Sequence, residues 1–199
     1  MLVDNIKNDH KEVSLQMAEL MQDSALNAFE LLNNLLKWAN LQRDAVSFNP
    51  QRLDLVGILD KELLYLKNNA TQKSISIISK LPKAQPVIAD ENMLRATIRN
   101  LISNAIKFTP TGGTVTVSAE QQGNKLTISF SDTGIGMTQG EIEKLFNFDT
   151  SFSKLGTNSE KGTGLGLILC WELVQKHGGT IWVKSEPEKG TIFSFNLPV

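Results

Sequence analysis

The amino-acid sequence predicts an α+β fold: a two-layer α/β sandwich with a mixed, largely antiparallel sheet covered on one face by helices, preceded by a long N-terminal helix. Two segments, "TVTVSAE" (114–120) and "KLTISFSD" (125–132), alternate apolar and polar residues as paired strands do. Between Glu12 and Arg43, apolar residues recur at spacings of three and four, which indicates one long helix. The rest of the chain mixes helices with strand hairpins, which favours a fold in which helices cover one face of a sheet.

The long N-terminal helix carries a heptad seam that other apolar residues widen. The seam consists of Met17, Met21, Ser24, Ala28, Leu31, Leu35, Trp38 and Gln42. Leu20, Leu32 and Leu36 broaden this stripe beyond that of a two-stranded coil. The helix either packs across the following domain or forms part of a dimeric bundle. We favour the bundle, because the seam is sustained and its small residues allow close approach.

Pro50 ends the helical pattern, and helices and short strands alternate after it. A helix is expected from about Leu55 to Asn68, followed by strands in "SISIIS" (74–79) and "PVIA" (86–89). Asp90 is a plausible N-cap for a helix that runs to about Lys107 and ends at "TPTGG".

The second half begins with the two alternating strands, which "QQGN" joins. A short helix is expected from about Thr138. The connection 146–161 is polar, rich in Gly, Ser and Thr, and longer than an ordinary loop, which is typical of a lid. The helix that follows "GTGLG" runs to "KHGG", and strands in "TIWVKS" and "GTIFSFNLP" close the chain.

Composition excludes several classes of protein. The 199 residues are 41% hydrophobic and 21% charged, which suits one domain with or without an appendage. A net charge of -1, without a basic run, argues against nucleic-acid binding. One cysteine and two histidines provide neither a disulfide nor a zinc site. No signal peptide and no apolar run of ~20 residues are present, so we expect a cytoplasmic domain, with membrane anchoring of a longer protein left open.

The glycine-rich segment "GTGLGL" (162–167) opens a helix, as phosphate-binding loops do. Its spacing is not the G-x-G-x-x-G of dinucleotide-binding folds, and no Gly-Lys dipeptide is present to form a P-loop. Taken alone, the segment is equally consistent with a flexible helix start whose small residues aid packing.

Three further motifs accompany it: "NLISNAIKFT" (100–109), "DTGIGM" (132–137) and "EKGTIFSF" (188–195). In this order and spacing they resemble the ATP-binding domain of sensor histidine kinases, in the superfamily that includes gyrase, the large chaperone ATPases and mismatch-repair ATPases. The resemblance covers about 48–199. The helix "SALNAFELLNNLLKWANLQ" (24–42) resembles the second helix of the kinase dimerisation and phosphotransfer domain.

The resemblance implies a site for ATP and Mg²⁺. Asp132 would accept the adenine amine, and Asn104, on one helix face with Asn100, would bind Mg²⁺ through its amide oxygen. Lys107 would reach the phosphates, with a solvated lysine as the alternative. The implied nucleotide-binding residues are Asn100, Asn104, Lys107, Asp132, Gly134, Gly136, Phe146, Lys161, Gly162, Thr163, Gly164, Leu165, Gly166, Leu167 and Thr191.

The glycines have separate implied roles. Gly134 and Gly136 would let the purine approach the backbone closely. The amides of Gly162, Gly164 and Gly166, with the positive end of the next helix, would hold the β- and γ-phosphates.

Two departures from the family pattern sharpen this interpretation. Hydrolysing relatives carry a Glu base four residues before the metal-binding Asn, and Asn100 occupies that position, which favours a kinase over an ATPase. The Phe-x-x-Phe box before the lid is not intact: Phe146 fits its first position, and Phe148 or Phe152 its second. Lys154 and Lys161 are candidate phosphate contacts or solvated lysines.

Neither histidine fits the acceptor motif. His10 lacks the Pro that shortly follows the family's acceptor, and His177 reads as a helix-end residue favoured by the helix dipole. We therefore expect residues 1–47 to be a remnant of the dimerisation and phosphotransfer bundle and residues 48–199 to be the catalytic domain of a protein-histidine kinase, whose acceptor histidine lies elsewhere.

The resemblance implies several partners: ATP or ADP, the acceptor helix of the full-length kinase, the receiver domain of a response regulator, and a second copy in the full-length protein. Two other functions stay open at this point. One is a serine kinase of the anti-sigma type, and the other is a nucleotide-binding interaction module without transfer activity.

Overall fold

Five strands form the central sheet of this chain in the computed structural model, in the order β2-β4-β5-β7-β6. The strands are Ser76–Ser79 (β2), Thr114–Gln122 (β4), Lys125–Asp132 (β5), Thr180–Glu186 (β6) and Gly190–Pro198 (β7). β2 runs parallel to β4, and the other neighbouring pairs are antiparallel. The predicted mixed, largely antiparallel sheet is therefore confirmed. The structure describes residues 47–146, 154–160 and 162–198, together with scattered positions between 14 and 39.

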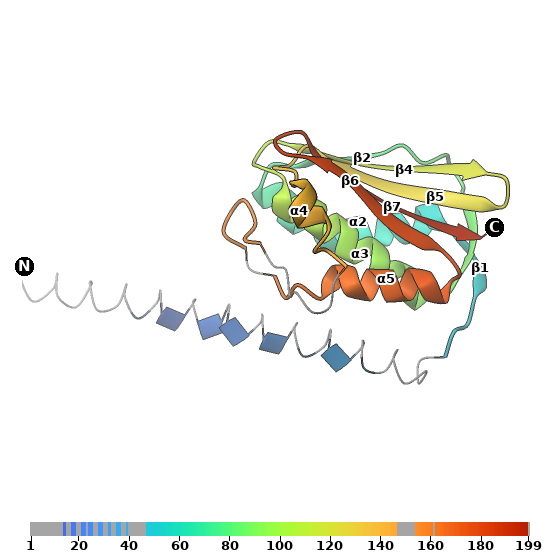
Figure 1. Cartoon of the computed structure of the whole chain (residues 1–199), viewed down its shortest axis with the longest axis horizontal. Coiled ribbons are helices and arrows are strands. Elements are labelled where there is room, and N and C mark those ends of the chain that lie inside the picture. The colour runs from blue at the N-terminus through green and yellow to red at the C-terminus, as the bar shows by residue number, and fades with distance from the viewer. Residues whose placement is uncertain are drawn as a thin grey trace, which may run out of the picture.

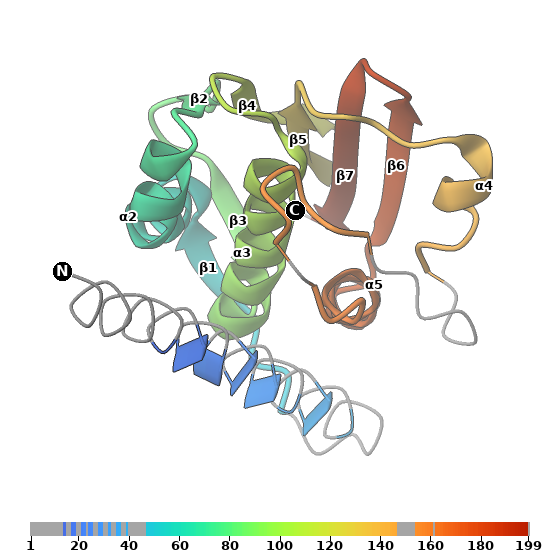
Figure 2. The same cartoon turned by 90° about the vertical axis from the view of Figure 1, so that its left-hand side faces the viewer.

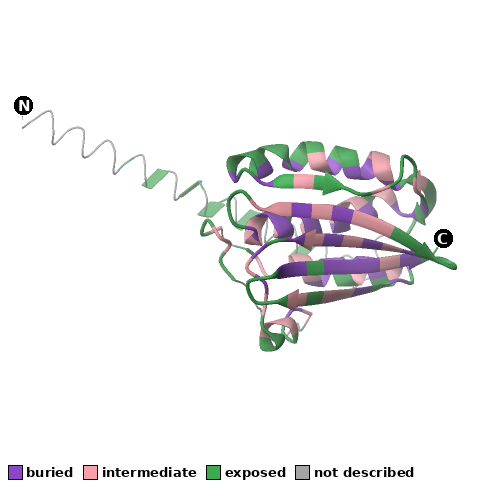
Figure 3. Ribbon diagram, turned by 90° about the horizontal axis from the view of Figure 1, so that it is seen from above, coloured by how far each residue is buried: buried purple, intermediate pink, exposed green. Residues whose placement is uncertain are grey.

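The two faces of this sheet differ as the alternating sequence predicts. Val117 of β4 lies opposite Phe130 of β5, and both side chains are buried. The next pair, Ser118 and Ser129, lies on the other face and is half-buried. Alternation along β4 and β5 thus gives one apolar face toward the helices and one hydroxyl-rich face, visible in Figure 3 as alternating bands of burial.

Helices cover the apolar face (Figures 1 and 2). They are Leu55–Gln72 (α2), Glu91–Phe108 (α3) and Gly166–Lys176 (α5), whereas the short helix Gln139–Ile142 (α4) buries no residue and lies beside β6. α3 lies between α2 and α5 and contacts both. Its Leu101 and Ile102 are 0% exposed, so α3 forms the centre of the core.

Side-chain caps fix the starts of α2, α3 and α4. The carboxylate of Asp90 accepts a hydrogen bond from the backbone N–H of Met93 at 3.1 Å, which confirms the predicted N-cap of α3. Thr138 and Glu141 form a reciprocal capping box at the start of α4. Asp54 caps α2 by accepting from the backbone N–H groups of Val56 and Gly57.

Two elements differ from the sequence-based expectation. Gln51–Asp54 (β1), where only a break was expected, pairs antiparallel with Pro86–Ala89 (β3) in a separate two-stranded sheet. α2 runs to Gln72 instead of ending near Asn68, because Ala70 is buried in the core and tertiary packing outweighs the weak helix propensity of the asparagines.

An ion-pair cluster joins α2 to α3. Glu62 is 0% exposed and accepts hydrogen bonds from Nε of Arg95 at 2.6 Å and Nε of Arg99 at 2.7 Å. Although burial opposes ionisation, the two guanidinium groups hold the pKa of the Glu62 carboxyl below its ordinary value. The orientation of α2 relative to α3 is therefore defined by charge as well as by apolar packing.

The described positions between 14 and 39 are helical, as predicted. Among the seam residues there, Met17, Met21 and Leu35 are exposed, and so are Phe29 and Leu32. The seam positions Leu31, Trp38 and Gln42 lie outside the described residues. No helix in the described part of the chain combines the length and apolarity needed to cross a membrane.

Candidate functional site

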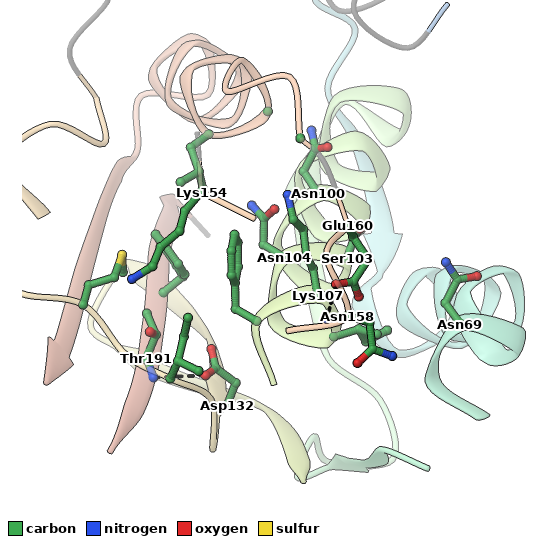
Figure 4. Close-up of a pocket in the computed structure, with 18 of the residues that line it drawn as sticks. Asn69, Asn100, Ser103, Asn104, Lys107, Asp132, Lys154, Asn158, Glu160 and Thr191 are labelled. Carbon is green, nitrogen blue, oxygen red and sulfur yellow. Dashed lines mark hydrogen bonds between the residues drawn. The ribbon is translucent and has the colours of Figure 1, made fainter. Parts of the chain in front are cut away.

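A cavity of about 400 Å³ opens between α3, the end of β5, the start of β7 and the loop that leads into α5 (Figure 4). It brings together most of the residues that the resemblance implied. The predicted residues that line it are Asn100, Asn104, Lys107, Asp132, Gly136, Gly162, Thr163, Gly164, Gly166, Leu167 and Thr191. These residues come from all four sequence motifs, the last of them at the start of the final strand.

Three predicted residues of the described part of the chain do not line the cavity. Gly134 lies beside it, where its backbone N–H contacts Asp132, and Leu165 is the N-cap residue of α5. Phe146 packs against the hydrophobic core instead. Lys161 lies outside the described residues, as do Phe148 and Phe152 of the incomplete phenylalanine box.

Asp132 provides a buried carboxylate at the floor of the cavity. Its side-chain oxygen Oδ1 accepts hydrogen bonds from the backbone N–H groups of Gly134 at 2.8 Å and Thr191 at 3.2 Å. In the described part of the chain, no donor reaches Oδ2. Burial raises the pKa of Asp132 to about 6, against the two hydrogen bonds, which lower it. The carboxylate is thus ionised at neutral pH and offers one oxygen as an acceptor.

The glycines beside Asp132 allow close packing of backbone. Gly136 has a φ of +63°, and a Cβ there would overlap the carbonyl group of Glu186 at the end of β6. A Cβ on Gly134 would lie 2.5 Å from the carbonyl oxygen of Phe108. Besides leaving room for a ligand, these glycines therefore let the loop after β5 lie directly against the end of α3 and the β6–β7 turn.

One face of α3 forms a polar wall of the cavity. Asn100, Asn104 and Lys107 follow one another at helical spacing, and Figure 4 shows all three along this wall. Lys107 Nζ lies 4.9 Å from the centroid of the Phe108 ring, within the range of a cation–π contact. The predicted alignment of the two asparagines on one helix face is confirmed.

Asn100 is held against α5. Its Oδ1 lies 3.4 Å from where a Cβ on Gly166 would be, so its side chain packs against the first turn of α5. Cys170 is 0% exposed, and burial raises the pKa of its thiol to about 12. An amide in this position supplies hydrogen bonds but no base of useful strength at neutral pH.

The start of α5 forms the remaining wall. Leu165 is its N-cap residue, and among the residues that the structure describes no side chain caps the helix. The N–H groups of an uncapped first turn, together with the helix dipole, attract an anion. Because Gly162, Thr163, Gly164, Gly166 and Leu167 line the cavity, this positive end faces its interior.

The segment 154–160 borders the cavity and contacts α4. Lys154, a candidate phosphate contact in the sequence, forms an ion pair with Glu141 of α4 at 2.9 Å. Asn158 and Glu160 line the cavity and lie near Lys107 in Figure 4.

Sequence reasoning missed the contribution of α2 and, within the predicted lid, of Asn158 and Glu160. α2 lines the cavity with Leu66, Asn69 and Gln72, and Lys73 follows. No motif marked α2, so no sequence signal pointed to these residues. Ser103, also missed, could have been found, because it lies four residues before Lys107 on the same helix face.

A two-layer sandwich whose cavity combines a buried acceptor carboxylate, a polar helix face and an uncapped helix N-terminus defines the class of ATP-binding domains that the motifs resemble. Comparison with protein families agrees: residues 89–199 match the family described as histidine kinase-, DNA gyrase B-, and HSP90-like ATPase. The chain belongs to this family, and within it to the ATP-binding catalytic domains of sensor histidine kinases.

Individual relatives support this assignment. The adaptive-response sensory kinase SasA of Synechococcus sp. (strain CC9311) is 34% identical over 171 residues, which cover 85% of this chain and 44% of that protein. The chain spans about half the length of the curated relatives it matches. Full-length ShkA in complex with AMPPNP is 29% identical, with a TM-score of 0.73 over 85% of this chain and 35% of ShkA.

The catalytic domain of histidine kinase ThkA matches nearly end to end. It is 25% identical with a TM-score of 0.66, over 75% of this chain and 95% of that domain. The part of this chain that corresponds to a separate catalytic domain is thus about three quarters of it.

Proposed function

We propose that this chain binds MgATP in the cavity and positions the γ-phosphoryl group for in-line transfer to a histidine of a dimerisation and phosphotransfer bundle. The observation that carries the proposal is the pairing of the buried Asp132 acceptor with the uncapped start of α5 across one cavity. An adenine amine fits the first group, and an oligophosphate fits the second. The complex of the relative ShkA with AMPPNP supports this choice of ligand.

Adenine would be recognised by Oδ2 of Asp132, since Oδ1 is already bonded to the backbone. An ionised carboxylate only accepts hydrogen bonds, so it selects a base with an exocyclic amine over one with a carbonyl at the same position. The β- and γ-phosphates would lie against Gly162, Gly164 and the first turn of α5. Lys107 would contribute positive charge from the opposite wall.

The residues of the cavity also fit a Mg²⁺ ion that binds together with the nucleotide. In the described part of the chain, no group of three or more His, Cys, Asp or Glu side chains could hold a metal without nucleotide. The side chain of Asn104 lines the cavity, and Mg²⁺ needs only one or two protein oxygens when phosphates and waters complete its shell. The ion would neutralise charge on the transferring phosphoryl group.

Transfer to histidine, rather than to water, is favoured by Asn100, which offers no base to activate water. The acceptor would be supplied by another polypeptide segment. His10 lies outside the described residues, and both ring nitrogens of the buried His177 are engaged in hydrogen bonds. We propose that residues 1–47 belong to the bundle, because apolar seam residues such as Met17, Met21 and Leu35 are exposed in this chain.

A trans-phosphorylation assay tests this function. The chain is incubated with γ-labelled MgATP and a separately supplied helical bundle that carries the acceptor histidine. Acid-labile label on the bundle, absent when the acceptor histidine is replaced by alanine, is the expected result. Nucleotide binding without any label would indicate an interaction module, and acid-stable label would indicate a serine kinase.

A further inference from the structure

Lys73, at the C-terminal end of α2, caps the end of α3. Its side chain is 5% exposed, and Nζ donates hydrogen bonds to the carbonyl oxygens of Ile106 and Lys107, each at 2.9 Å. These carbonyls belong to the last turn of α3, which has no intrahelical donors for them. Lys73 therefore stabilises the helix turn that carries Lys107 and that directly follows Asn104.

The same ammonium group binds the loop before α5. Lys73 Nζ lies 2.6 Å from Oγ1 of Thr157 and 2.9 Å from Oε1 of Glu160. Thr157 in turn donates from its hydroxyl to the carbonyl oxygen of Thr109 at 2.9 Å and from its backbone N–H to that of Lys107 at 3.1 Å. Residues 156–160, called the anchored turn below, are thus attached to the end of α3 through one buried lysine and through Thr157 itself.

Internal bonds make the anchored turn a compact unit. The backbone N–H of Gly156 donates to the carbonyl oxygen of Glu160 at 2.9 Å, and that of Asn158 donates to Oε2 of Glu160 at 2.8 Å. A Cβ on Gly156 would lie 2.7 Å from Cγ of Lys107, so the backbone packs directly on the lysine side chain. The turn therefore contacts both Lys73 and Lys107.

Charge holds this arrangement together. Burial opposes ionisation of Glu160, but hydrogen bonds from Lys73 and from backbone N–H groups hold the pKa of its carboxyl below the ordinary value. Lys73 has four acceptors within 2.9 Å for three N–H groups, and Glu160 is the charged one among them. Removing either partner would leave a poorly compensated charge in a partly buried site.

We propose that Lys73 is a positioning residue of the nucleotide site that acts through Thr157 and Glu160. It fixes the anchored turn on α3 and thereby fixes the glycine loop, which begins two residues later at Gly162, relative to Asn104 and Lys107. This inference rests on the proposed function. It predicts that Lys73 determines the affinity for the phosphates and leaves adenine binding at Asp132 unchanged.

Thr157→Val and Glu160→Gln test the inference, because both leave Lys73 on the α3 carbonyls. Thr157 does not line the cavity, so its effect on a ligand must be indirect. Glu160 does line it, and removing a negative charge beside phosphates would by itself strengthen binding. Lys73→Met removes the whole anchor, and Lys67→Met, an exposed lysine of α2, is the matched control.

Calorimetry with MgAMPPNP and an NMR titration with adenosine give the decisive comparison. We expect about tenfold weaker MgAMPPNP binding in Thr157→Val and Glu160→Gln, unchanged adenosine binding, and wild-type values for Lys67→Met. Stronger or unchanged MgAMPPNP binding in both variants, or an equal loss of adenosine binding, would overturn the inference.

Hydrogen exchange of the nucleotide-free protein provides a second readout. In both variants the amides of Gly156, Thr157 and Asn158 should exchange faster, while those of β7 keep the wild-type rate. Wild-type protein that fails to bind MgAMPPNP would reject the proposed function. In that case the exchange result alone decides whether Lys73 anchors the turn, and unchanged exchange would show that it does not.

Discussion

The ring of His177 joins the end of α5 to the start of α3, because its Nε2 accepts a hydrogen bond from the backbone N–H of Asp90 at 3.0 Å. Its Nδ1 lies 2.7 Å from the carbonyl oxygen of Leu173, which can only accept, so Nδ1 carries the proton and the ring is neutral. Phe48 packs edge-on against the ring, with centroids 5.0 Å apart. Buried hydrogen bonds of a neutral ring, rather than the helix dipole, thus account for histidine at this position.

Replacing His177 by alanine should destabilise the fold. The variant leaves the buried N–H of Asp90 without its acceptor and removes the contact with Phe48. We expect the free energy of unfolding to fall by about 1–3 kcal/mol, measured by chemical denaturation. Gln175→Ala, at an exposed position of the same helix, is the control and should change it by less than about 0.5 kcal/mol. Equal effects of the two substitutions would contradict the bridging role.

Asp132→Asn should weaken adenine nucleotides sharply at neutral pH. The substitution keeps the shape of the side chain but replaces an acceptor-only group with one that can direct an NH₂ group at the adenine amine. Loss of a hydrogen bond to a charged group corresponds to about 10- to 100-fold in affinity, measurable by calorimetry with ADP. An unchanged ADP affinity, with the fold intact by circular dichroism, would remove Asp132 from the adenine site.

The affinity for adenosine should decrease as the pH falls below about 6. Burial raises the pKa of Asp132 to about 6, and the protonated carboxyl no longer offers an acceptor-only Oδ2. Adenosine is the suitable probe because it has no phosphates that titrate in this range. In Asp132→Asn the pH dependence should vanish, and a persistent decrease in that variant would assign the titration to another group.

The same pKa shift determines the sign of the effect on stability. An unfolded Asp132 has the ordinary value of 3.8, so between 3.8 and about 6 the folded chain binds more protons. The contribution of Asp132 to the free energy of unfolding therefore decreases as the pH rises through this interval. Asp132→Asn should abolish that part of the pH dependence in denaturation experiments.

Asn104→Ala should damage the Mg²⁺-dependent part of ATP binding. An alanine removes the one amide oxygen proposed as a protein ligand and leaves the adenine and phosphate contacts in place. Affinity for AMPPNP measured with Mg²⁺ should fall toward the value measured with a chelator. Ser103→Ala, which changes the neighbouring cavity residue, is the matched control. An equal loss with and without Mg²⁺ would mean that Asn104 acts on the structure of α3 instead.

Incubated alone with labelled MgATP, the chain should bind nucleotide but neither label itself nor hydrolyse ATP appreciably. His177 is buried, and Asn100 occupies the place of the base, whose absence costs about 10²- to 10⁴-fold in rate. Asn100→Glu should raise hydrolysis, measured as phosphate release. Stoichiometric acid-labile label that disappears in His10→Ala would overturn the assignment of the acceptor to another segment.

Local features of the fold could be predicted from the sequence. The caps at Asp90 and Thr138 involve backbone N–H groups three residues away, so the residue type and the next few positions suffice to identify them. β1 could not be predicted, because "QRLD" is short and polar, and its pairing with β3 depends on residues more than thirty positions away.

The candidate site divides in the same way. Asn104, Asp132 and the glycine loop lie in motifs that the sequence displays, and the fold brings these motifs to one cavity. The contact between Lys73 and Glu160 spans 87 positions and joins two residues outside any motif. Such a contact cannot be predicted from the spacing of residues or from the composition of the sequence, because it depends on the packing of α2 against α3.

Cys170 gives this protein a practical property. It is the single cysteine of the chain, it is fully buried, and a thiol with a pKa of about 12 carries almost no thiolate at neutral pH. Maleimide reagents react with thiolates, so they should leave the wild-type protein unmodified. A cysteine introduced at the exposed Leu155 would then be labelled selectively with a fluorophore, without first replacing Cys170. Such a label would report movements beside the cavity in single-molecule experiments.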